Sequence, residues 1–230
     1  MSHYKPYPAY KDSGVEWIGK VPEHWIPCAL KRVLVETISG GTPDTDNPEF
    51  WANDENGVPW VAISDMSFTE VVTVTQKFVT AKGIASKRLR ILPQGTLLFS
   101  MYASLGHVAE LGLPATTNQA ILGLVPNEQI DQRYLKRWLQ FLQPYLVVGS
   151  SNTTQDNLNA EKVQNLPCFK IRSSEQKAIV GFIDRETARI DALIEKVQLS
   201  IDLLKKRRSA LITAAVTGQI DVRQYGKEAT

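Results

Sequence analysis

The sequence is poor in the residues that build special scaffolds. Cys28 and Cys168 are its only cysteines among 230 residues and lie 140 positions apart, so it offers neither a disulfide framework nor a CxxC metal pair. No uncharged apolar run reaches the roughly 18 residues that a membrane span needs. Charges occur throughout the first thirty residues, which argues against the apolar core of a signal peptide there. These absences favour a reducing, cytoplasmic location without membrane contact.

Recognisable catalytic patterns are also missing. There is no glycine loop ending in Gly-Lys-Ser/Thr to hold phosphates, and no Asn-Pro-Pro-aromatic loop of an adenine methyltransferase. Lys77 lacks the acidic residue two positions earlier that a PD…(D/E)xK nuclease requires. The histidines, His3, His24 and His107, show no metal-ligand spacing. We therefore expect a non-catalytic chain that binds no metal and no cofactor of its own.

Charge is distributed unevenly along the chain. Lysine and arginine are absent from residues 33–76, which carry acidic residues only, whereas residues 71–109 contain no acid. The basic residues of this second stretch are Lys77, Lys82, Lys87, Arg88 and Arg90. The pattern predicts a body with one acidic and one basic face. A basic face attracts phosphate backbones, although an ordinary solvated surface would also accommodate these charges.

The sequence pattern of residues 1–172 is typical of a mixed α+β body. Apolar or β-branched runs bounded by turn residues predict strands at 71–75, 96–100 and 121–125. Apolar residues at a spacing of three and four predict a short helix over 132–142, which should end before Pro144. Gly40 and Gly41 are expected to form a turn with positive φ.

After Ser173 the composition changes to that of one long helix. Residues 174–216 contain no proline and a single glycine, Gly181. Ser173 and Gln176 have the spacing of a capping box, and Gly218 is a suitable residue just beyond the C-terminal end. We therefore predict three parts: a folded domain over 1–172, a coiled-coil helix over 173–218 and a tail over 219–230.

A heptad seam runs along the predicted helix. Ten positions at alternating spacings of four and three include Thr187 and Arg208, and the other eight are apolar: Ile183, Ile190, Ile194, Val197, Ile201, Leu204, Leu211 and Ala215. A helix of 42 residues would extend about 63 Å, longer than a body of this size would cover. The seam therefore predicts a partner helix, with Arg208 suited to setting the register. A helix folded back as a hairpin on its own body is the alternative.

Several short stretches, in order, resemble one protein family. They are Ser13-Gly14-Val15-Glu16-Trp17-Ile18-Gly19, Val21-Pro22-Glu23-His24-Trp25, Gly40-Gly41-Thr42-Pro43, Phe50-Trp51, Val58-Pro59-Trp60-Val61, Gly95-Thr96-Leu97-Leu98-Phe99-Ser100, Thr117-Asn118-Gln119-Ala120, Glu175-Gln176 and Ala215-Val216-Thr217-Gly218. Together they resemble the specificity subunits of type I restriction-modification enzymes over nearly the whole chain. Such a subunit holds two target-recognition domains, each followed by a long helix, and the two helices pair antiparallel. The present chain resembles one half.

The resemblance implies a sequence-specific reader of one half of a bipartite duplex DNA target. Its implied partners are a methyltransferase subunit that carries S-adenosylmethionine, a restriction subunit, and a second copy or another half paired through the helix. The basic residues named above would contact phosphates. For base readout we expect polar loop residues, although each could equally cap a turn: Ser100, Tyr102, Ser104, Thr117, Asn118, Gln119, Asn152, Thr154 and Gln155. A coiled-coil scaffold for proteins, without DNA affinity, is the alternative function.

Overall fold

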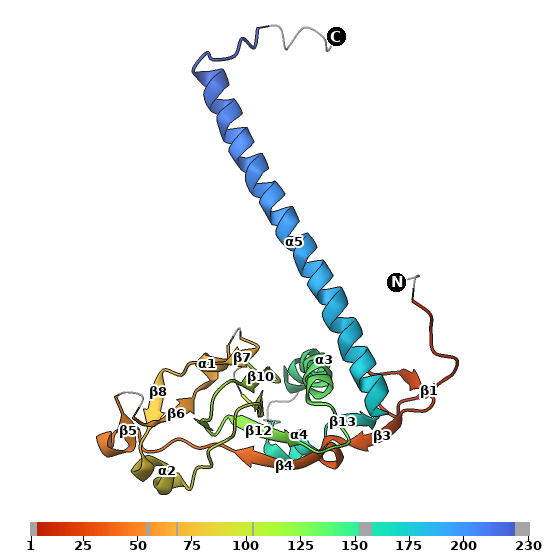
Figure 1. Ribbon diagram of the computed structural model, residues 1–230, viewed down its shortest axis with the longest axis vertical. Coiled ribbons are helices and arrows are strands. Elements are labelled where there is room, and N and C mark those ends of the chain that lie inside the picture. The colour runs from red at the N-terminus through yellow and green to blue at the C-terminus, as the bar shows by residue number, and fades with distance from the viewer. Residues whose placement is uncertain (1–3, 54–55, 68, 103, 152–157, 224–230) are drawn as a thin grey trace. The chain divides into compact units, whose positions relative to one another are not determined.

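The computed structural model describes residues 4–53, 56–67, 69–102, 104–151 and 158–223 (Figure 1). The chain forms two compact units, Met1–Val180 and Gly181–Thr230. The first, called the body below, combines sheets and helices, and the second consists mainly of the continuation of one long helix. The predicted α+β class with a long C-terminal helix is confirmed.

The body is organised around a five-stranded sheet. Its strand order is β4-β12-β9-β10-β7, antiparallel except for the parallel pair of β10 and β7. The strands are β4 (Leu34–Ser39), β7 (Val71–Val72), β9 (Leu97–Ser100), β10 (Val108–Leu111) and β12 (Ile121–Pro126). Strands expected near 96–100 and 121–125 are confirmed. The strand expected over 71–75 was too long, since only Val71 and Val72 pair and Val74 is 75% exposed.

Smaller elements surround this sheet. A second sheet has the order β11-β6-β8-β5, and the pairs β1-β2 and β3-β13 complete the described strands. Their bounds are β1 (Tyr10–Asp12), β2 (Lys20–Pro22), β3 (Ile26–Ala29), β5 (Trp51–Ala52), β6 (Val58–Val61), β8 (Lys77–Val79), β11 (Thr116–Thr117) and β13 (Pro167–Lys170). Short helices are α1 (Ile63–Met66), α2 (Ala81–Lys87), α4 (Ala160–Gln164) and the 3-10 turns Leu30–Val33 and Pro48–Phe50.

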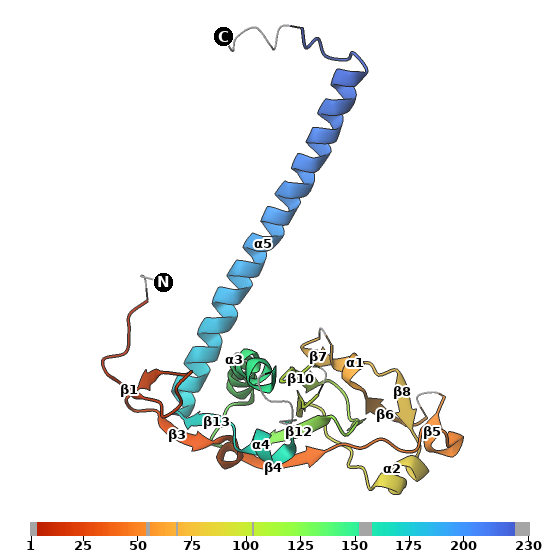
Figure 2. The ribbon, with the colours of Figure 1, turned by 180° about the vertical axis from the view of Figure 1, so that it is seen from behind.

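Helix α3 (Gln132–Ser151) lies beside β10, as both views show (Figure 2). Leu135, Leu139 and Leu142 are fully buried against the sheet. The prediction that this helix ends before Pro144 is wrong, because Pro144 lies inside it. The missing hydrogen bond of an interior proline is outweighed here by packing, since Leu146 joins the main core beyond it.

Helix α5 (Ser173–Val216) begins within the body. Gln176 is buried, and its side-chain amide donates to the Gln129 and Ile171 carbonyls while its oxygen accepts from the Asp131 amide. The capping-box prediction is therefore wrong, because the Gln176 side chain bonds the segments just after β13 and just before α3 instead of folding back on the helix end. Val180 is buried too, so the first two turns belong to the body's packing.

From Gly181 onward α5 continues without interruption to Val216. A single helix of 44 residues contradicts the alternative of a folded-back hairpin. The predicted end is confirmed: Gly218 has φ +72°, its amide donates to the Ala215 carbonyl, and the Gln219 amide donates to the Ala214 carbonyl. This is the paired hydrogen-bond pattern of a Schellman cap. No helix in the described parts of the chain combines the length and apolarity needed to cross a membrane.

Candidate nucleic-acid interface

Three polar loops leave the five-stranded sheet at one end. Ser39 at the end of β4 lies opposite Leu122, and Ser100 at the end of β9 lies opposite Ile121, the first residue of β12. Loops 40–42, 101–107 (described except for residue 103) and 118–120 must therefore emerge together, since antiparallel neighbours place the end of one strand beside the start of the next. We call this region the loop end. Four of the nine residues selected from sequence for base readout lie in these loops, and Ser100 and Thr117 directly precede two of them.

Gly40 and Gly41 permit close chain contact at the loop end. A Cβ atom on Gly40 would lie 2.1 Å from the Asn118 carbonyl oxygen, and one on Gly41 would lie 2.9 Å from Leu89. Neither glycine has positive φ, so the expectation of a left-handed turn is wrong. Gly40 is needed because the Thr117 and Asn118 backbone occupies the space that a side chain would fill, and Gly41 because Leu89 does.

Further hydrogen bonds hold segment 40–42 in place. The Gly41 amide donates to the Thr117 carbonyl over 2.8 Å, and the Trp60 indole donates to the Gly41 carbonyl over 2.9 Å. The Thr42 hydroxyl bonds the side-chain oxygen of Gln119. Loop 40–42 is thereby fixed to β11, β6 and loop 118–120 at once.

Helix α2 brings two basic residues to this place. The Lys87 Cβ atom lies 3.7 Å from where a Gly41 Cβ would be. Arg88 follows as the C-cap of α2, with φ +51° and ψ 42°, and is the only non-glycine with positive φ in the described residues. Both side chains are exposed, and within the described part of the chain neither makes an ion pair. They supply free positive charge beside the polar loops.

The other predicted basic residues are neutralised or placed elsewhere. Arg90 forms two hydrogen bonds with Glu36, at 2.5 and 3.0 Å, and Lys82 pairs with Glu49 at 3.1 Å. The hydrogen bond from Arg90 holds the pKa of Glu36 below its usual range. Lys77 lies over the Trp51 and Trp60 rings. The prediction of separate acidic and basic faces is therefore wrong, because the fold pairs residues from the two stretches.

The predicted base-reading residues differ in accessibility. Ser100 and Thr117 are almost fully buried, and the Ser100 hydroxyl donates to the Tyr102 carbonyl. Both are thus scaffold in this structure, a correction to their selection as DNA contacts. Tyr102 and Gln119 are exposed, Ser104 is half-buried, and half-buried Asn118 accepts a hydrogen bond from the Ala120 amide. The predicted Asn152, Thr154 and Gln155 lie outside the described residues.

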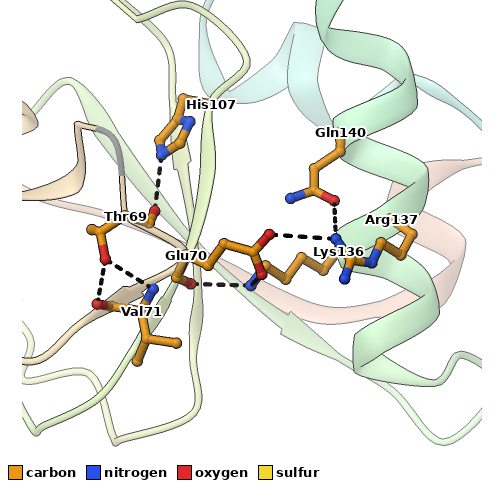
Figure 3. A network of polar contacts seen from close by, with 7 residues as sticks. All are labelled: Thr69, Glu70, Val71, His107, Lys136, Arg137 and Gln140. Carbon is orange, nitrogen blue, oxygen red and sulfur yellow. Dashed lines mark hydrogen bonds and ion pairs between the residues drawn. The ribbon is translucent and has the colours of Figure 1, made fainter. Parts of the chain in front are cut away.

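A polar network that the sequence did not reveal lies between α3 and the residues that lead into β7 (Figure 3). Lys136 on α3 is 8% exposed and donates to the backbone and the carboxylate of Glu70, each over 3.0 Å. Hydrogen bonding from Lys136, with nearby Arg137, lowers the pKa of Glu70. His107, directly before β10, contacts the Thr69 carbonyl at 3.3 Å. These contacts attach α3 and loop 101–107 to the start of β7, across sequence separations that no local pattern signals.

A second unpredicted cluster holds the beginning of α5. The Glu175 carboxylate accepts hydrogen bonds from the Tyr7 hydroxyl and the Trp25 indole, each at 2.9 Å, and lies 2.8 Å from His24. Burial alone would raise the pKa of Glu175, but the hydrogen bonds from Trp25, His24 and Tyr7 prevail and lower it. The N-terminal segment therefore fixes the first turn of the long helix.

The seam of α5 presents its apolar side chains to solvent. Exposed fractions along it run from 40% at Ile201 to 63% at Leu204, while Ile183 and Ala215 are half-buried. The other exposed seam residues are Ile190, Ile194, Val197 and Leu211. Leu193 and Ile212, which flank the seam, are also exposed and widen the apolar stripe. An apolar stripe of this length is typical of a protein-binding surface.

Comparisons with known proteins agree with this architecture. The chain is 28% identical over 193 residues to the Type I restriction enzyme MjaIX specificity subunit of Methanocaldococcus jannaschii, covering 82% of this chain and 43% of that subunit. It is 24% identical over 213 residues to the EcoR124I/EcoR124II specificity subunit of Escherichia coli, covering 86% and 47% respectively. The chain thus spans less than half the length of these curated relatives.

Solved structures share the fold. The HsdS subunit from Thermoanaerobacter tengcongensis superimposes with a TM-score of 0.62 at 19% identity, over 80% of this chain and 41% of that one. A chain from a study of complex assembly and conformational transition of the type I R-M system gives a TM-score of 0.71 at 20% identity, over 90% and 48%. The family model for the type I restriction modification DNA specificity domain matches residues 22–202. The chain therefore belongs to the family of type I restriction-modification DNA specificity domains.

Proposed function

We propose that this chain is a non-catalytic DNA-recognition module that reads one half of a bipartite target for a type I restriction-modification system. The observation that carries the proposal is the loop end, where three polar loops converge beside Lys87 and Arg88. Positive charge attracts the phosphate backbone, and adaptable polar side chains read base edges. Rigid attachment of the loops to sheet and helix then fixes their register on the duplex.

The accessible side chains suggest a division of roles. Lys87 and Arg88 contact phosphates, and Gln119, whose amide can pair with adenine, reads a base edge together with Tyr102. Buried Ser100 and Thr117 hold the loops in shape.

The long helix supplies the connection to other subunits. Burial of each exposed seam residue in a partner helix would contribute about 1.5–3 kcal/mol of gross apolar stabilisation. We propose an antiparallel pair with a second copy or another half, which places two reading bodies on one DNA. Methyltransferase subunits carrying S-adenosylmethionine and restriction subunits then dock on this pair in the cytoplasm and perform the chemistry.

Selection of bound duplexes from a random pool, with and without a methyltransferase partner, tests the proposal. We expect a split consensus with a fixed gap, and each lost phosphate contact in Lys87→Ala and Arg88→Ala should reduce the salt slope by about 0.9. Lys82→Ala is the matched control, because its charge is already paired with Glu49. The absence of duplex affinity at any salt concentration would favour the scaffold alternative.

A further inference from the structure

The two cysteines lie directly opposite each other in the β3-β13 pair. Cys28 and Cys168 are register partners of antiparallel strands, flanked by the pairs of Pro27 with Phe169 and Ala29 with Pro167. Opposed residues in such a pair have Cα atoms about 4.5–5.5 Å apart, within the 4.4–6.8 Å range of a disulfide. Both cysteines are free thiols in this structure. The backbone therefore already provides the spacing that a disulfide needs.

The two thiols differ in accessibility and acidity. Cys28 is half-buried, whereas Cys168 is 1% exposed. A hydrogen bond from Cys168, with nearby Lys170 and Arg32, lowers the pKa of Cys28 to about 7. The same hydrogen bond and burial raise the pKa of Cys168. Cys28 is thus suited to attack as a thiolate, while Cys168 is accessible mainly to Cys28.

We propose that Cys28 and Cys168 form a reversible oxidation site whose substrate is a low-molecular-weight disulfide. The Cys28 thiolate attacks one sulfur of the substrate, forming a mixed disulfide and releasing one thiolate, which takes up a proton. Cys168 then loses its proton and attacks the Cys28 sulfur, which releases the second thiol of the substrate. In sum, two protein thiols lose two electrons and two protons, and the substrate disulfide is reduced to two thiols.

The Cys28–Cys168 disulfide would crosslink the body near the start of α5. Strand β13 ends at Lys170, three residues before α5, and β3 directly follows the segment whose His24 and Trp25 hold Glu175. A crosslink between residues 140 apart removes much freedom from the unfolded chain. The loop end contains neither cysteine, so this site is independent of the proposed DNA contacts.

Incubation of the full chain with oxidised glutathione tests the proposal. We expect both thiols to be lost without a disulfide forming between chains, and peptide mapping to join Cys28 to Cys168. The melting temperature should rise by several degrees and return to its original value with dithiothreitol. The reaction rate should increase through about pH 7, following the pKa of Cys28.

Two serine variants distinguish the roles of the thiols. Cys168→Ser should stop at the mixed disulfide on Cys28, because the second step has no thiol. Cys28→Ser should remain unmodified, because Cys168 is buried. Persistence of both thiols in the wild type, disulfides only between chains, or equal modification of the two variants would each overturn the proposal. The wild-type peptide map decides even if a variant fails to fold.

Discussion

The body and the helix beyond Gly181 use apolar residues in opposite ways. Phe99 and Leu122 in the body are fully buried, whereas Ile194 and Leu204 on the helix are more than 60% exposed. The body completes its own core with sheets and α3, while the helix leaves an apolar seam without a covering in the single chain. The difference indicates that the first region is stabilised from within and the second by association.

The largest expected effect comes from one glycine of the body. Gly40→Ala should destabilise the body by about 3 kcal/mol or more, because the new Cβ would lie 2.1 Å from the Asn118 backbone oxygen. Thermal or denaturant unfolding measures this loss. The fixed backbone cannot move without opening the loop end, so duplex binding should fall with it.

Gly181 in α5 provides the matched control for this substitution. A Cβ there meets nothing within 4 Å, so Gly181→Ala should stabilise the helix by about 0.5–1 kcal/mol. The same chemical change would then have opposite signs in the two regions. Equal effects of the two variants would contradict the contrast between a packed loop end and an open helix.

The predictability of the two regions from sequence follows from the range of their interactions. The helix was predicted to within a few residues because heptad spacing, the lack of proline and Gly218 are local signals. Strands β9 and β12 were predictable as apolar runs. The continuation of α3 through Pro144 was not, since it depends on the distant core around Leu146.

Self-association is the next largest expected effect. Ile194→Asp combined with Ile201→Asp should weaken pairing at least about 100-fold, because two charges would enter the apolar seam. Sedimentation over a range of concentrations measures the change. The control combines Leu199→Asp with Leu203→Asp, which are exposed but lie off the seam, and should leave pairing much less affected. A monomeric wild-type chain at all concentrations would reject the pairing.

The candidate site shows where sequence reasoning stops. The predicted residues around 100–104 and 116–119 lie close together, while Asn152, Thr154 and Gln155 fall outside the described residues. Ser100 and Thr117 could not be separated from Gln119 because burial depends on tertiary contacts. Arg90 and Arg88 lie two positions apart, yet of the two only Arg90 pairs with Glu36 of β4. Charge along the sequence therefore overstated the number of free cations.

Replacing Arg88 by glycine should raise stability and weaken DNA binding. Its φ of +51° costs an L-residue about 1 kcal/mol that glycine avoids, so Arg88→Gly should raise the unfolding free energy by about that amount. Loss of the guanidinium should weaken duplex binding about 10-fold. Unfolding and binding titrations measure the two changes. Arg90→Gly, in contrast, should lower stability slightly, and unchanged binding in Arg88→Gly would remove this residue from the interface.

The smallest expected effect is the acid dependence of the Glu175 cluster at the start of α5. The lowered pKa of Glu175 means that its contribution to stability is complete above the unfolded value of about 4.3 and is lost as the pH falls through the folded pKa. Glu175→Gln should therefore flatten the acid limb of the stability profile by less than about 1 kcal/mol, given partial solvent screening. The control, Glu161→Gln, removes an exposed carboxylate on α4 outside this cluster and should alter the profile less than Glu175→Gln does. If both variants follow the wild-type curve, the cluster of Tyr7, His24 and Trp25 does not stabilise the ionised carboxylate, and buried residues such as Gln176 and Val180 hold the start of α5 instead.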